Sequence, residues 1–119
     1  MTTHELVRKL QAGEIDRAEV ETIARALAPY LPPRDTFERN SLIRALVTNF
    51  AAGGLSGNET AEWLRVEFAR FEAGGDWKAW RRLRVCPETT ERRRLMWRIR
   101  IFDSLPKRTQ LLEILNQEQ

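Results

Sequence analysis

Arginine and tryptophan recur along one segment near the C-terminal end of the sequence, and their spacing suggests a binding surface. Arg93, Trp97 and Arg100 are spaced four and three residues apart, so on a helix they share one face. Arginine makes bidentate contacts with phosphate, and tryptophan can stack on a base. The same two residue types are enriched at the centres of protein–protein interfaces. The stripe therefore predicts a partly exposed face that binds either a nucleic acid or an acidic protein.

The basic residues of this segment extend beyond the stripe. From residue 78 to residue 108 the sequence has 11 basic residues and three acidic ones. In an alternative arrangement, Trp97 packs beneath a neighbouring helix and the arginines are solvated or paired with Glu88, Glu91 or Asp103. The residues expected to contact a partner are Lys78, Arg81, Arg82, Arg84, Arg93, Arg94, Trp97, Arg98, Arg100, Lys107 and Arg108.

Charge is unevenly divided along the chain. Residues 1–76 carry 9 Lys/Arg and 12 Asp/Glu, whereas residues 77–119 carry 11 Lys/Arg and 5 Asp/Glu, within a net charge of +3. A basic part of this kind suggests an acidic partner. However, 17 of the 20 basic residues are arginine, and such a preference can equally reflect the base composition of the genome.

Residues for enzyme chemistry are scarce, and we expect a protein that is not an enzyme. The one histidine is His4, and the one cysteine is Cys86. A Ser-His-Asp or Cys-His arrangement would need His4 as its base, and this pair alone cannot complete a zinc site. No metal or other cofactor is therefore expected. Cys86 precedes Pro87 near an expected helix start, where a thiol pKa can fall, although a lone cysteine is more often a small, partly buried apolar residue.

Two further patterns favour structure over chemistry. The carboxylate pairs Glu59–Glu62 and Glu88–Glu91 fall in the first turns of expected helices, where acidic side chains interact favourably with the helix dipole. The glycines stand at helix ends and do not form a nucleotide-binding loop. The glycine-rich break at residues 53–57 is longer than the turn of a DNA-reading helix-turn-helix, and acidic residues on the following helix would repel phosphate.

Helices must position these residues, because apolar residues recur three and four apart and alternating β-branched runs are absent. Start and stop signals divide the chain into about six or seven short helices. These helices are expected to begin near residues 5, 16, 35, 56, 76, 87 and 104. Because the connections are short and the helices unequal, we expect an all-α fold over residues 1–119, a single domain that forms a compact bundle with non-parallel packing.

The helix that follows Asp35 is expected to form the centre of the core, because its apolar residues cover more than one face. Trp77 and Trp80 are expected to anchor the short helix near residue 76. On the helix that begins near residue 16, the expected buried stripe is Val20, Ile23, Ala24 and Leu27. The apolar set of the helix after Asp35 is Phe37, Leu42, Ile43, Ala45, Leu46, Val47 and Phe50.

The remaining expectations concern location and function. No stretch approaches the roughly 18 apolar residues that span a membrane, and the N-terminal segment does not have the apolar run of a secretory signal. Together with the single cysteine, this pattern favours the reducing cytoplasm. The sequence thus predicts a small cytoplasmic nucleic-acid-associated binding protein, a regulator or an accessory subunit. The alternative is an adaptor or inhibitor that docks on an acidic protein through the same surface.

Overall fold

The computed structural model describes residues 4–5, 8 and 17–116, and every regular element in these residues is helical. The expected all-α fold is therefore confirmed. The first expected helix, over residues 5–11, falls largely outside the described residues. The elements are α2 (Arg17–Leu27), the 3-10 turn η1 (Ala28–Tyr30), α3 (Thr36–Phe50), α4 (Gly57–Ala73), α5 (Gly75–Trp80), α6 (Glu91–Phe102) and α7 (Arg108–Asn116).

Local capping signals fix the starts of α3 and α4. The side chain of Asp35 accepts a hydrogen bond of 2.8 Å from the backbone N–H of Glu38. Ser56 and Glu59 form a reciprocal capping box, in which each side chain accepts a hydrogen bond from the backbone N–H of the other residue, at 3.1 and 2.9 Å. These bonds satisfy amides that have no partner within the first helical turn. Both helices therefore begin where the sequence predicts.

The start of α6 differs from the expectation. The helix begins at Glu91, and Thr90 caps it by accepting a hydrogen bond of 3.3 Å from the backbone N–H of Arg93. Pro87 lies before the helix, next to Cys86, whose backbone N–H donates to the carbonyl oxygen of Tyr30 at 2.8 Å. A threonine side chain supplies a cap, whereas proline is only tolerated in a first turn. The prediction that the helix starts at Pro87 is thus wrong.

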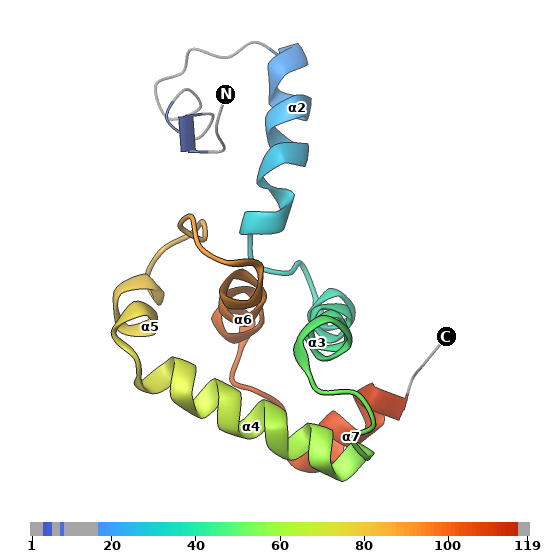
Figure 1. Ribbon diagram of the computed structural model, residues 1–119. Coiled ribbons are helices and arrows are strands. Elements are labelled where there is room, and N and C mark those ends of the chain that lie inside the picture. The colour runs from blue at the N-terminus through green and yellow to red at the C-terminus, as the bar shows by residue number, and fades with distance from the viewer. Residues whose placement is uncertain (1–3, 6–7, 9–16, 117–119) are drawn as a thin grey trace.

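The core forms around α6, which is seen end-on in Figure 1 with α3 and α5 on either side and α4 across one end of the group. The expectation that apolar residues of α3 are buried on more than one face is wrong, because Phe37 in its first turn is 77% exposed and the buried residues Leu42, Ile43 and Leu46 share one side. The buried residues of α6 cover more of its circumference than those of α3. The largest fully buried side chains are Trp97, Phe68, Ile43, Leu46, Leu64, Ile99, Leu111 and Cys86.

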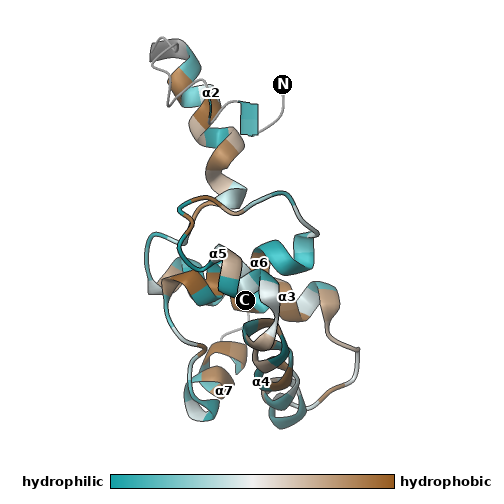
Figure 2. Ribbon diagram, turned by 90° about the vertical axis from the view of Figure 1, so that its left-hand side faces the viewer, coloured by the Kyte–Doolittle hydropathy of each residue, from teal (hydrophilic) through white to brown (hydrophobic). Residues whose placement is uncertain are grey.

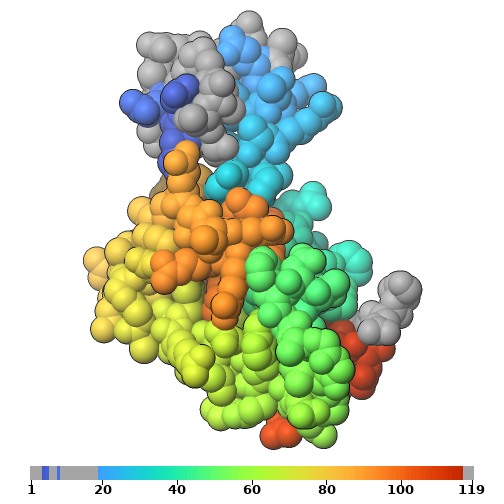
Figure 3. All heavy atoms as spheres, viewed as in Figure 1, coloured from blue at the N-terminus to red at the C-terminus, as the bar shows by residue number. Residues whose placement is uncertain are grey.

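Helix α2 extends away from the bundle of α3 to α7, and among the described elements it contacts mainly η1 (Figures 1 and 2). The radius of gyration is 16.0 Å, larger than the roughly 13–14 Å of a compact chain of this length. In the expected buried stripe, Ile23 and Leu27 are buried, but Ala24 is exposed and Val20 is 44% exposed. The space-filling view narrows between the two parts (Figure 3). None of the helices in the described residues has the length and apolar character to cross a membrane.

Leu46 tests the packing of α3 against the core. Its side chain is 0% exposed, so Leu46→Ala leaves a cavity and should lower the free energy of unfolding by roughly 2–5 kcal/mol. Phe37→Ala on the same helix is the matched control and should change it by less than about 0.5 kcal/mol, because that ring is already in water. Denaturant unfolding followed by circular dichroism measures both values. If both substitutions lowered the free energy of unfolding by the same amount, the assigned packing of α3 would be contradicted.

Candidate functional site

Trp97 does not lie on the surface. The indole is 0% exposed, and its Nε1 donates a hydrogen bond of 3.0 Å to the carbonyl oxygen of Trp80. The prediction of a partly exposed tryptophan is therefore wrong. Its physical reason is the central position of α6, which leaves little of that helix facing water. No base or partner side chain can stack on a ring in this position, so Trp97 anchors the core and holds the end of α5.

The arginines of α6 mostly face carboxylates on neighbouring helices. The guanidinium of Arg100 also lies over the ring of Trp77, at 4.9 Å from its centroid. The paired arrangement considered from the sequence is thus correct in kind, but its acidic partners come from α4 and α5 instead of Glu88, Glu91 or Asp103. Among the described residues, the ion pairs that join α6 to these helices are Arg92–Glu67, Arg93–Asp76 and Arg100–Glu72.

Arg98 and Arg94 are also engaged within the fold. Arg98 is 13% exposed at its side chain, donates to the carbonyl oxygen of Leu31 at 2.7 Å and lies 3.5 Å from a carboxylate oxygen of Glu38. Burial lowers the pKa of Arg98, which the charge of Glu38 partly opposes. Arg94 lies over the ring of Tyr30, at 5.0 Å from the centroid. These two arginines thus connect α6 to the turn η1, to Leu31 just after it and to the first turn of α3.

A different part of the predicted set is free. Lys78, Arg81, Arg82 and Arg84 are all exposed, and their side chains have no hydrogen bond or ion pair with any residue that the structure describes. The backbone of Arg81 is helical and its N–H donates to Trp77, so α5 continues into this turn. Lys78, Arg81 and Arg82 therefore lie on one side, at helical spacing. We call the side chains of Lys78, Arg81, Arg82 and Arg84 the α5 cationic cluster.

Lys107 and Arg108 lie elsewhere. They precede and begin α7, and Arg108 donates a hydrogen bond of 3.2 Å to the side-chain oxygen of Asn58 at the start of α4. Figure 1 shows α5 and α7 near opposite ends of α4, which is about 25 Å long for its 17 residues. The single basic surface expected from the sequence is thus divided into two cationic areas, with paired arginines between them.

Cys86 and His4, the two residues considered for catalysis, lie in different surroundings. Cys86 is fully buried, and burial raises its pKa to about 11, against smaller opposing effects of Arg94 and Arg98. The suggestion of a lowered thiol pKa is wrong, and the buried apolar interpretation is confirmed. The Nδ1 atom of His4 lies 3.3 Å from a carboxylate oxygen of Glu88. In the described part of the chain, no three His, Cys, Asp or Glu side chains gather as metal ligands.

Glu38→Gln tests the contribution of the buried arginine. The substitution leaves the largely buried Arg98 without its carboxylate, so it should lower the free energy of unfolding by about 1–3 kcal/mol. The second partner of Glu38 is the exposed Arg34, which should contribute little. Glu62→Gln, which breaks the exposed pair with Arg65, is the control and should cost less than about 1 kcal/mol. Urea unfolding of both variants distinguishes them, and a larger loss for Glu62→Gln would contradict this assignment.

Cys86 gives a test that depends on pH. A thiol whose pKa rises on folding contributes stability that is complete below its ordinary value of 9.0 and is lost as the pH rises toward about 11. The native protein should therefore resist iodoacetamide at about pH 8, where the buried group is neutral, and should react after denaturation. Mass spectrometry of the alkylated chain measures both states. Rapid labelling of the native protein would show that the thiol is accessible.

Comparison with known proteins does not help to interpret this surface. No protein-family model, curated protein or solved structure matches the chain. Its chemistry must therefore be inferred from its own residues. Among the predicted contact residues, the α5 cationic cluster is the largest group that is exposed and left unpaired by the described fold.

Proposed function

We propose that the chain binds the phosphate backbone of a nucleic acid through the α5 cationic cluster, as a regulator or an accessory subunit. The observation that carries this proposal is the contrast between two groups of cations. The arginines of α6 face carboxylates or rings within the fold, whereas the four cations of the cluster face none among the described residues. An anion from another molecule supplies the missing charge.

The electrostatics of the cluster support an anionic partner. Its cations are close along the chain, and like charges at short range repel each other. Asp76 is the acidic residue nearest to the cluster in sequence, but its carboxylate binds Arg93. The chain has 17 Asp/Glu, and the described fold directs others toward α6. A phosphate backbone would relieve this repulsion and release the counterions that the free surface holds.

The residue types suit a phosphate backbone. Three of the four cations are arginines, whose planar guanidinium groups match the oxygen atoms of a phosphate in a bidentate geometry. Leu83, at 42% exposure, is the large exposed apolar residue beside the four cations, and no tryptophan of the described residues is fully exposed next to them. Contacts of this kind position a nucleic acid without reading its bases. The proposed binding is therefore weakly dependent on sequence and strongly dependent on salt.

Arg81→Ala, Arg82→Ala and Arg84→Ala test the proposal. Each substitution should weaken binding of a fluorescent oligonucleotide and reduce the slope of log K against log salt by about one unit for each phosphate that the variant no longer binds. Arg65→Ala is the matched control, because Arg65 is exposed but already paired with Glu62. This variant should keep the full slope. Anisotropy titrations at several salt concentrations provide the measurement.

Two outcomes would oppose nucleic-acid binding. In one, the oligonucleotide affinity is the same for the wild-type chain and for the triple variant of Arg81, Arg82 and Arg84. In the other, the chain binds no oligonucleotide but retains an acidic protein from a nuclease-treated extract, and the triple variant loses that protein. The second result would favour an adaptor or inhibitor. The affinity of such a protein–protein interface falls less steeply with salt concentration.

A further inference from the structure

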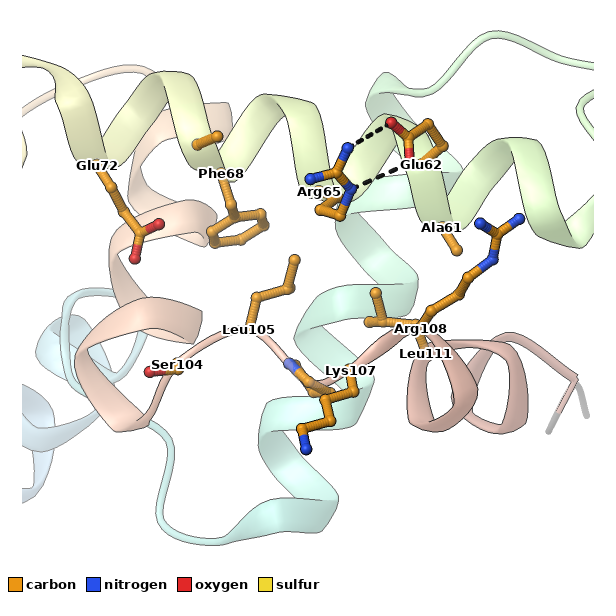
Figure 4. A pocket seen from close by; sticks show the side chains of 12 residues that line it. Ala61, Glu62, Arg65, Phe68, Glu72, Ser104, Leu105, Lys107, Arg108 and Leu111 are labelled. Carbon is orange, nitrogen blue, oxygen red and sulfur yellow. Dashed lines mark hydrogen bonds and ion pairs between the residues drawn. The ribbon is translucent and has the colours of Figure 1, made fainter.

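A groove runs along α4 and is lined by residues other than those of the α5 cationic cluster. Its volume is about 430 Å³, and it lies between α4 and the segment that joins α6 to α7. Figure 4 shows Phe68 and Ala61 projecting from α4 toward Leu105 and Leu111 on the opposite side. The size is within the range of pockets that hold small molecules, roughly 300–1,000 Å³.

The floor of the groove is apolar and well supported. Phe68, Ala61 and Leu111 are buried in the core, so the groove rests on rigid packing instead of on loose side chains. Leu105 is partly buried and extends between the two sides of the groove (Figure 4). An apolar group that fits beside Leu105 would leave water and contact these side chains, which is a favourable transfer.

Along the α4 edge of the groove, the carboxylates of Glu62 and Glu72 are both paired with arginines. Glu62 accepts two hydrogen bonds from Arg65, at 2.8 and 3.1 Å, and this interaction holds the pKa of Glu62 below its ordinary value. Glu72, at the other end of the same edge, is paired with Arg100 of α6. Both carboxylates therefore face arginines of the chain itself, and the charge of Arg108 also helps to lower the pKa of Glu62. A cationic ligand would have to compete with these arginines.

The opposite edge is positive. The guanidinium of Arg108 reaches toward α4 and hydrogen-bonds only the neutral side chain of Asn58 among the described residues (Figure 4). The ammonium of Lys107 points outward from the same edge, and it has no ion pair with a described residue. Arg65 also lines the groove but is held by Glu62, so Arg108 is the guanidinium there without an ion pair to a described residue, and Lys107 adds positive charge beside it.

From these features we infer that the groove binds a small carboxylate with an apolar body. The apolar part lies against Phe68, Leu105 and Leu111, and the carboxylate meets the guanidinium of Arg108, which presents two N–H groups to two oxygens. The volume suits one ring or a short alkyl chain and is too small for a folded partner. This site is independent of the proposed nucleic-acid surface and adds a ligand-binding function to the chain.

Phenylbutyrate is a suitable probe, because it joins one aromatic ring to a carboxylate through a short chain. Titration into the full chain, followed by amide chemical shifts in NMR spectra, should give saturable changes confined to residues 61–72 and 104–111. Phenylbutylamine has the same body with the opposite charge, so it should bind at least about tenfold more weakly. Failure of phenylbutyrate to saturate these shifts, or equal binding of the amine, would overturn the inference.

Amino-acid substitutions show which cation binds the carboxylate of phenylbutyrate. Arg108→Gln should weaken phenylbutyrate about tenfold, and Lys107→Gln should weaken it less, since its ammonium points outward. Lys78→Gln, in the α5 cationic cluster, is the control and should leave the affinity unchanged. Circular dichroism verifies that each variant is folded, and Leu105→Glu provides a second test by placing a negative charge in the apolar part of the groove. Unchanged affinity in Arg108→Gln or in Leu105→Glu would place the probe elsewhere and overturn the inference.

Discussion

The fold depends on burying a helix that is rich in arginine. Residues of α6 provide the largest buried side chain, Trp97, but five arginines occupy the same 12-residue helix. Guanidinium groups remain charged, so a helix of this composition is stable at the centre only if neighbouring elements supply carboxylates, carbonyl oxygens or ring faces. Helices α3, α4 and α5 and the turn η1 all provide them. The arrangement of the bundle therefore follows from both the apolar and the charged residues of α6.

This arrangement gives the uneven charge of the chain a second explanation. The acidic residues of α4 and α5 and the basic residues of α6 attract one another across an internal boundary, so much of the basic excess is neutralised by the chain itself. Glu67, Glu72 and Asp76 each take one arginine in this way. Within residues 77–116, the cations outside this balance lie at α5 and at the start of α7, and these are the two areas to which the proposals above assign anions.

The sequence predicted the features that depend on near neighbours. Asp35 and Ser56 mark helix starts because a cap is formed by residues three positions apart, and the apolar spacing identifies α-helices for the same reason. The position of Trp97 was missed because its helical face is defined only once the surrounding helices are known. The acidic partners of α6 were also missed, since they lie 17 to 28 residues away in sequence. The complementary charges of residues 59–76 and 92–100 were the available signal, and they indicate packing more directly than an external partner.

The position of Tyr30 has a consequence for how the chain opens. Its carbonyl oxygen accepts the N–H of Cys86 and its ring lies beside Arg94, so the turn η1 belongs to the bundle, while α2 contacts mainly that turn among the described elements. If α2 opens separately from the bundle, its amide hydrogens should exchange with solvent at a lower free energy than those of α6. Tyr30 would then stand at the boundary between the two units.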